Sequence, residues 1–199
     1  MTTGTQDPAA RAAAALSDAL ASFTNGAASA PDPAPQGREP DPHDVARQIV
    51  LRQLAMAPRS RAQLAQKLAQ RDVSADVASA VLDRMTEVGL VDDEAYAQML
   101  VRTQQAGRGL AKRAIARELR TKGIDDDLAR QALASIADAD ERDRARALVD
   151  KKLKPMHGLA VQVQTRRLAG MLARKGYSPG LTYTVIREAI ADAPEHLPD

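Results

Sequence analysis

The 199-residue sequence contains no cysteine, which excludes disulfide-stapled scaffolds and thiolate metal sites and fits a reducing compartment. Aromatic residues make up only 2% of the chain, and alanine and leucine are abundant, a balance typical of helical proteins. No run of about 18 apolar residues occurs, so we expect no membrane-spanning helix. The alanine-rich N-terminus has no basic start, and we expect no signal peptide. These absences predict an all-α protein of the cytoplasm.

Prolines and acidic residues set the first 42 residues apart from the rest of the chain. The stretch "APDPAPQGREPDP" blocks regular hydrogen bonding, and its low apolar content cannot offset the entropy of ordering. We therefore predict a disordered tail over 1–42. Its five acidic and two basic residues give it a net charge of −3, which leaves +5 on 43–199 because the whole chain carries +2. This basic excess favours an acidic protein surface or a phosphate backbone as partner.

Apolar residues recur at helical spacing from residue 43 onward, in three segments that superpose without gaps in their second and third helices. The second helices align through the pairs Leu64 and Leu68, Ile115 and Leu119, and Leu168 and Leu172. The first helices align through the pairs Val45 and Ile49, Tyr96 and Leu100, and Val149 and Leu153. The pattern predicts three-helix repeats at 43–91, 92–138 and 139–193, with a C-terminal tail at 194–199. Units this small must bury apolar surface against a neighbour, so we expect an elongated, curved rod of stacked repeats.

The expected helix boundaries carry the residue types that helix ends need. Five oxygen-bearing side chains stand at predicted N-cap positions: Ser60, Ser74, Asp92, Asp125 and Ser178. At the end of the second helix, Gly123 and Gly176 predict a left-handed backbone, and Asp72 occupies the same position in the first repeat. Aspartate tolerates that conformation less well than glycine does.

Other motifs are better explained by structure than by catalysis. Gly107 and Gly109 resemble half of a dinucleotide fingerprint, but no apolar strand precedes them and no third glycine follows at the required spacing. We interpret them as a turn between helices. The acidic clusters at 92–94 and 125–127 stand at helix starts, where carboxylates cap amide groups. The histidines show no metal-ligand spacing and no serine has the context of a nucleophile, so we expect no metal, no cofactor and no enzymatic activity.

The second helix of the middle repeat has an arginine-rich outer face. With about 100° per residue, Arg113, Arg117 and Arg120 lie about 140° to 200° away from Ile115, which faces the core. The equivalent positions are Ala62, Gln66 and Ala69 in the first repeat, and Arg166, Gly170 and Ala173 in the third. The repeat architecture therefore does not require this charge. A solvated surface, contact with DNA and docking on an acidic protein are all compatible with it.

A longer motif covers residues 89–133, from "GLVDDEAYA" to "RAIARELRTKGI". It combines a Gly-Leu-apolar-Asp-Asp start, an aromatic residue in the next helix and a basic run that ends in Lys-Gly-apolar. Its structural positions here are Asp92, Asp93, Tyr96, Ile115, Glu118, Leu119, Lys122 and Gly123. On these motifs, residues 43–191 resemble the RecX family of bacterial regulatory proteins.

The resemblance implies a function as well as a fold. RecX proteins modulate RecA, the recombinase that coats single-stranded DNA as an ATP-bound filament. By resemblance, the chain would be a monomer that lies in the helical groove of the filament and limits strand exchange, ATP hydrolysis and cleavage of the LexA repressor. The expected contacts to the filament or its DNA come from Arg102, Arg108, Lys112, Arg113, Arg117 and Arg120. The alternative is a helix-turn-helix-like protein that competes for DNA directly, without contacting RecA.

Overall fold

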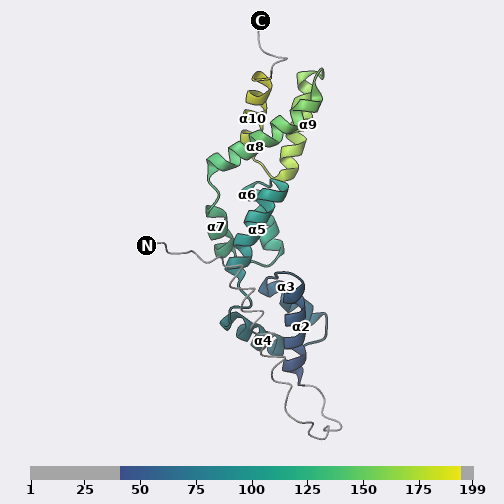
Figure 1. Cartoon of the computed structure of the whole chain (residues 1–199), viewed down its shortest axis with the longest axis vertical. Helices are drawn as coiled ribbons and strands as arrows, with labels where there is room; N and C mark the ends of the chain where they lie inside the picture. Colours follow the sequence, from purple (N-terminus) through teal and green to yellow (C-terminus); the bar gives the residue numbers. More distant parts are fainter. Residues whose placement is uncertain (1–40, 194–199) are drawn as a thin grey trace, which may run out of the picture. The chain divides into compact units, whose positions relative to one another are not determined.

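The computed structural model describes residues 41–193, and these residues form nine α-helices, one 3-10 helix and no strand (Figure 1). The helices are α2 (Pro42–Met56), α3 (Arg61–Ala69), α4 (Ala75–Glu87), α5 (Asp93–Arg108), α6 (Lys112–Thr121), α7 (Asp126–Ala134), α8 (Asp138–Leu153), η1 (Lys154–Met156), α9 (Val161–Lys175) and α10 (Pro179–Ala191). The predicted all-α class with three helices per repeat is confirmed. The stacking of the repeats into a rod stays a prediction.

The predicted tails lie outside the described residues, apart from the last two positions of the N-terminal one. Asp41 is the N-cap of α2, and its side chain accepts a hydrogen bond from the amide of His43. Pro42 opens the helix, at a position where the missing N–H of proline costs nothing. None of the helices within residues 41–193 is long and apolar enough to cross a membrane.

The chain divides into two compact units, Met1–Tyr96 and Ala97–Asp199, with the boundary inside α5. In the first unit α2, α3 and α4 pack against one another. Val50, Leu64 and Leu82 lie at the centre of this core. Ser60 and Gln63 cap α3 reciprocally, each side chain accepting a hydrogen bond from the other residue's amide, which fixes where the second helix begins.

The first helices follow a register that differs from the predicted one. Val45 is 37% exposed, and the buried pair of α2 is Ala46 and Val50. The same alanine-valine pair, four residues apart and buried, recurs in the other two first helices, as Ala97 and Val101 in α5 and as Ala145 and Val149 in α8. Tyr96, Leu100, Val149 and Leu153 are buried as predicted, but Val45 is not, and the predicted match of Val149 to Tyr96 was wrong because Val149 is equivalent to Val101. Alanine, a weakly hydrophobic residue, marks the true register.

This register also shows that the third repeat is longer between its first two helices. Val101 precedes Ile115 by 14 residues, whereas Val149 precedes Leu168 by 19. The additional chain forms η1 and the turn at Gly158. Met156, at the end of η1, is buried in the core of this repeat, so the insertion contributes a side chain to that core.

The three second helices end as the sequence predicts, with a left-handed residue. The φ angles are 58° at Asp72, 74° at Gly123 and 89° at Gly176. Asp72 is the single residue other than glycine with a positive φ among residues 41–193. Glycine adopts this region without the steric cost that a β-carbon adds.

We predict that Asp72→Gly stabilises the protein by about 0.5–1 kcal/mol. The substitution removes a left-handed strain of about 1–2 kcal/mol, and the added freedom of glycine in the unfolded chain offsets about 0.4–1 kcal/mol of it. Urea unfolding followed by circular dichroism measures the change. An unchanged or lower free energy of unfolding would mean that Asp72 is not strained.

In the second unit α6 packs on α7, and α8, α9 and α10 pack against one another. The turn before α6 lies against the end of α9: the amide of Ala111 donates to the carbonyl of Lys175 at 3.0 Å, and the hydroxyl of Tyr177 donates to the carbonyl of Gly109 at 3.1 Å. Gly109 forms this turn, with a φ of 58°, but Gly107 lies within the last turn of α5 instead of in the turn. These contacts join the middle and third repeats.

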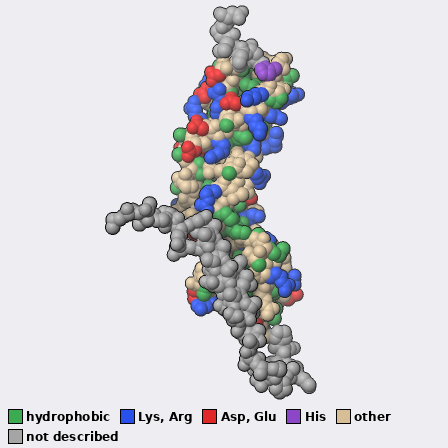
Figure 2. Space-filling view, in the orientation of Figure 1, with side chains coloured by type: hydrophobic (Ala, Val, Ile, Leu, Met, Phe, Trp, Pro, Cys, Tyr) green, Lys and Arg blue, Asp and Glu red, His purple; other side chains and the backbone are tan. Residues whose placement is uncertain are grey.

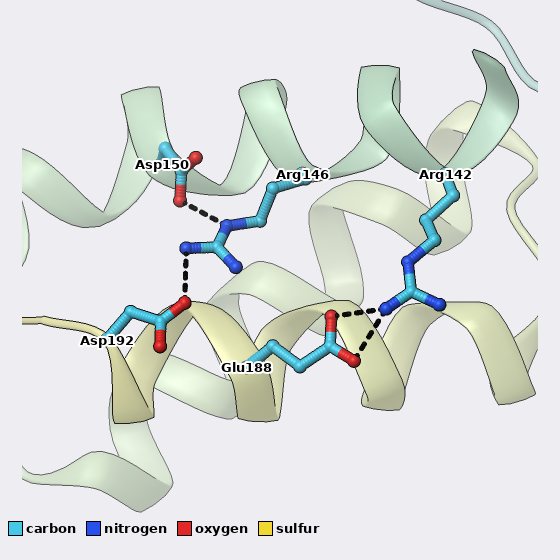
Figure 3. Close-up of polar contacts among 5 residues, drawn as sticks. All are labelled: Arg142, Arg146, Asp150, Glu188 and Asp192. Atoms are coloured by element: carbon cyan, nitrogen blue, oxygen red, sulfur yellow. Dashed lines mark hydrogen bonds and ion pairs between the residues drawn. The ribbon is translucent and has the colours of Figure 1, made fainter. Parts of the chain in front are cut away.

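Two arginines of α8 tie that helix to α10 (Figure 3). Arg142 donates from Nη2 to both carboxylate oxygens of Glu188, at 2.7 and 2.9 Å. Arg146 donates to Asp150 on its own helix at 2.8 Å and to Asp192 at 2.9 Å. Because these side chains are partly exposed, they fix the register of the two helices more than they add stability.

The predicted N-caps are largely confirmed. The side chains of Ser60, Asp92, Asp125 and Ser178 each accept a hydrogen bond from an amide in the first turn of the helix that they begin. Ser74 also occupies an N-cap position, but its side chain makes no capping hydrogen bond.

Candidate partner-binding surface

The outer face of α6 carries three arginines, Arg113, Arg117 and Arg120, which we call the arginine face. Ile115 and Leu119, one turn apart on the opposite side, are fully buried, whereas all three arginines are exposed. The predicted orientation is therefore confirmed. Figure 2 shows lysine and arginine side chains gathered along one edge of the second unit.

Two carboxylates of α8 hold the first turn of α6. Ala111 occupies the N-cap position and has no side-chain oxygen, so the cap comes from elsewhere. Glu141 accepts a hydrogen bond from the amide of Lys112 at 2.9 Å, and Asp138 accepts one from the Lys112 ammonium at 2.6 Å. The hydrogen bond from Lys112 lowers the pKa of the Asp138 carboxyl. The start of the helix that bears the arginine face is thus fixed by the third repeat.

The first repeat contains the same link. Asp93 accepts a hydrogen bond from the amide of Arg61, the first residue of α3, at 2.8 Å. Asp93 and Glu141 each precede the buried alanine of their helix, Ala97 and Ala145, by four residues. An acidic residue of one repeat therefore caps the second helix of the repeat before it, which explains why the motif places a carboxylate there.

The arginines of the face differ in how far they are engaged. Arg113 and Arg117 form no ion pair with any residue in 41–193. Arg120 pairs with Asp126 at 3.6 Å, and both side chains are more than two-thirds exposed. An exposed pair of this kind contributes little free energy, so it can give way to a partner. All three guanidinium groups are thus available for a carboxylate or a phosphate.

The other three predicted contact residues have different surroundings. Lys112 is held by Asp138 and is the least available of the six. Arg108 lies 3.8 Å from Glu118, which also accepts a hydrogen bond from Gln104 at 2.9 Å. Arg102 is exposed and forms no ion pair with a described residue. The six basic residues therefore differ in how far their charges are already paired within the protein.

The structural positions of the motif have identifiable roles. Asp92 caps α5 by accepting from the amide of Ala95 at 2.8 Å, and Tyr96 is buried one turn further along. Lys122 is the C-cap of α6, directly before the left-handed Gly123. With Ile115 and Leu119 in the core and Glu118 bound by Gln104 and Arg108, these residues shape and hold the helix.

The residues that position α6 from outside its repeat were not predicted from the sequence. Asp138 and Glu141 belong to the acidic run at the start of α8, and Lys175 and Tyr177 end the second helix of the third repeat. Ala97 and Ala145 are equivalent and lie 48 residues apart. The same offset from Asp93 leads to Glu141, so the correct register would have identified this residue. No group of His, Asp and Glu side chains in the described part of the chain converges as a metal site.

Family models match this chain over most of the described residues. The models for the first, second and third three-helix domains of RecX match residues 46–85, 92–133 and 139–186. These three segments coincide with the three groups of helices in the structure.

Curated proteins and a solved crystal structure are similar to this chain over most of their own length. The chain is 47% identical over 159 residues to "Regulatory protein RecX" of Thermobifida fusca, covering 78% of this chain and 86% of that one. It is 45% identical over 182 residues to "Regulatory protein RecX" of Streptomyces coelicolor, covering 89% and 97%. The crystal structure of RecX from Lactobacillus salivarius superposes with a TM-score of 0.69 at 25% identity, covering 75% of this chain and 97% of that one. The chain belongs to the RecX family of regulatory proteins.

Proposed function

We propose that this protein binds the RecA–single-stranded DNA filament in its helical groove and modulates the recombinase, ATPase and LexA-coprotease activities of RecA in the cytoplasm. The observation that carries the proposal is the arginine face of α6, where three exposed guanidinium groups lie on one rigid helix. Membership of a family of regulatory proteins supports a binding role in place of a catalytic one.

The chemistry of the arginine face suits a rigid, acidic partner. Arginine donates paired hydrogen bonds in a fixed geometry, which matches carboxylate and phosphate groups better than lysine does. Burial of Ile115 and Leu119 and the cap from Glu141 keep the helix in place before binding. A preformed surface loses less entropy on binding than a mobile one does.

A repeated architecture also suits a repeated partner. A chain of linked modules engages neighbouring subunits of a filament at once, and the second contact benefits from the high effective concentration that the first creates. A ligand that favours one state of the filament shifts the filament population toward that state. This mechanism regulates RecA without any active site on the ligand.

We predict that replacing Arg113, Arg117 and Arg120 together with alanine raises the concentration needed for half-maximal effect on RecA ATP hydrolysis by about 10- to 100-fold. The range corresponds to about 1.4–2.8 kcal/mol for three charged contacts at a surface. The fold should be retained, because exposed substitutions usually cost less than about 0.5 kcal/mol each. ATP hydrolysis on single-stranded DNA, titrated with each variant, measures the shift.

A matched control is available in the first repeat. Arg52 and Arg71 are exposed and form no ion pair with a described residue, and the exposed Arg84 pairs with Glu87 at 3.0 Å. The arginine face likewise has two arginines without an ion pair in the described part of the chain and one with a pair. The alanine triple at Arg52, Arg71 and Arg84 changes the net charge equally and should shift the titration by less than about threefold. Equal effects of the two triples would show that only total charge matters.

A further inference from the structure

The third repeat has an open apolar groove between α9 and α10. Two adjoining hollows, of about 700 and 640 Å³, share Val161, Thr165 and Tyr183 in their linings. All lining residues belong to these two helices or to Tyr177 in the turn between them. We call this feature the α9–α10 groove. It lies on the third repeat alone and includes no residue of the arginine face.

The sequence creates the groove at the positions that carry the arginine face in the middle repeat. In α9 the residues equivalent to Arg113, Arg117 and Arg120 are Arg166, Gly170 and Ala173, and all three line the groove. Because Gly170 and Ala173 are small, they leave the furrow between α9 and α10 uncovered. The same helix surface is therefore a basic ridge in one repeat and an apolar furrow in the next.

Large apolar side chains remain uncovered in this furrow. Val161 is 41% exposed and Tyr183 is 59% exposed, although the core of the same repeat is closed, with Leu168, Leu172 and Ile186 almost fully buried. Exposed apolar surface that is concentrated in one groove, next to a complete core, is typical of a site for a partner.

The groove has a basic rim and no acidic lining residue. Arg166 of α9 and Arg187 of α10 line it, and both are exposed without an ion pair among residues 41–193. The guanidinium of Arg174 reaches over Gly170, with Nη1 at 3.4 Å from where a β-carbon would stand. Glu188 of α10 and Asp192 at its C-cap are already paired with Arg142 and Arg146 of α8.

We infer that the α9–α10 groove is a docking site for an acidic amphipathic helix of a partner protein. Two helices leave a furrow that accepts a third, whose apolar residues at i, i+3/i+4 and i+7 would cover Val161 and Tyr183. Carboxylates on both flanks of that helix would meet Arg166 on one side and Arg187 on the other. A second copy of the chain is a poorer occupant, because a two-fold contact would bring the like-charged rims together.

Two synthetic helical peptides test this inference with the full chain. Both peptides have about 18 residues with one leucine stripe; the first has glutamate on its flanks, and the second has lysine at the same positions. We expect the glutamate peptide to bind at least 10-fold more tightly in fluorescence anisotropy. Arg187→Glu should remove most of this preference, and Tyr183→Ala should weaken the glutamate peptide by at least 10-fold.

A control separates this inference from the proposed function. The alanine triple at Arg113, Arg117 and Arg120 should leave peptide binding unchanged, even if it abolishes the effect on RecA. Circular dichroism should show retained helix content in Tyr183→Ala and Arg187→Glu, because both side chains are exposed.

Four results would overturn the inference. Equal affinity for the two peptides would exclude an acidic partner, and loss of binding in the α6 triple alone would place the site elsewhere. A monomer–dimer equilibrium that Tyr183→Ala abolishes would identify a second copy as the occupant. Peptide binding that appears only after removal of residues 1–40 would identify the protein's own N-terminal segment.

Discussion

Gly176→Ala should destabilise the protein by about 1.5–4 kcal/mol, a large part of the stability of an ordinary domain. Gly176 has a φ of 89°, and a β-carbon there would lie 2.7 Å from the β-carbon of Ala114 and 2.9 Å from its amide nitrogen. The left-handed backbone costs about 0.5–1 kcal/mol after the lost freedom of the unfolded chain is subtracted, and forcing α9 away from the start of α6 costs about 1–3 kcal/mol. The middle and third repeats meet at this contact.

Two other glycines in the same unit separate the two causes. Gly158 has a φ of 75° but open space around it, so Gly158→Ala should cost only the backbone strain less the lost freedom of the unfolded chain, about 0.5–1 kcal/mol. Gly180 lies in α10 with open space and no positive φ, so Gly180→Ala should be neutral or stabilising by up to about 1 kcal/mol. Thermal and urea unfolding measure the series. Equal losses for Gly176→Ala and Gly158→Ala would show that the contact with Ala114 contributes nothing.

Ionisation of Tyr177 should lower the free energy of unfolding by roughly 1 kcal/mol between pH 8 and pH 11. Burial raises the pKa of this phenol to about 12 from the ordinary value of 10.0, with a smaller increase from Glu141 and an opposing effect of Arg144. The folded state therefore keeps the proton that the unfolded state loses. The stabilisation is complete below pH 10 and is lost as the pH rises through about 12.

Tyr177→Phe isolates this contribution. The variant should cost about 1 kcal/mol at neutral pH, because the hydrogen bond to the carbonyl of Gly109 is lost. Between pH 8 and pH 11 its free energy of unfolding should decrease by roughly 1 kcal/mol less than that of the native protein. Parallel pH profiles of the two proteins would show that Tyr177 ionises normally in the folded state.

The positions and ends of the second helices could be predicted from residues that are close together in the sequence. The second helices were identified from apolar pairs such as Ile115 and Leu119, which are both buried, and their left-handed ends from Gly123, Gly176 and Asp72. Short-range signals of this kind depend on residues within one turn of each other. For the same reason, the exposure of the arginine face followed from the helical period alone.

The remaining features depend on residues that are distant in sequence. The buried face of the first helices uses alanine, a weak signal, so the match of Val149 to Tyr96 gave the third repeat a misleading register. The engagement of Lys112 by Asp138 and Glu141 links positions 26 and 29 residues apart, which no periodic pattern indicates within one repeat. The α9–α10 groove arises from small residues whose effect appears only when two helices pack.

The most direct test of the account compares binding to a preassembled RecA filament on single-stranded DNA with binding to the bare strand. Both are measured at one fixed salt concentration, because arginine contacts to either surface weaken as salt rises. We predict tighter binding to the filament, by at least 10-fold, and loss of this preference when Arg113, Arg117 and Arg120 are replaced with alanine. Tighter binding to the bare strand would contradict the account and indicate a protein that competes for DNA directly.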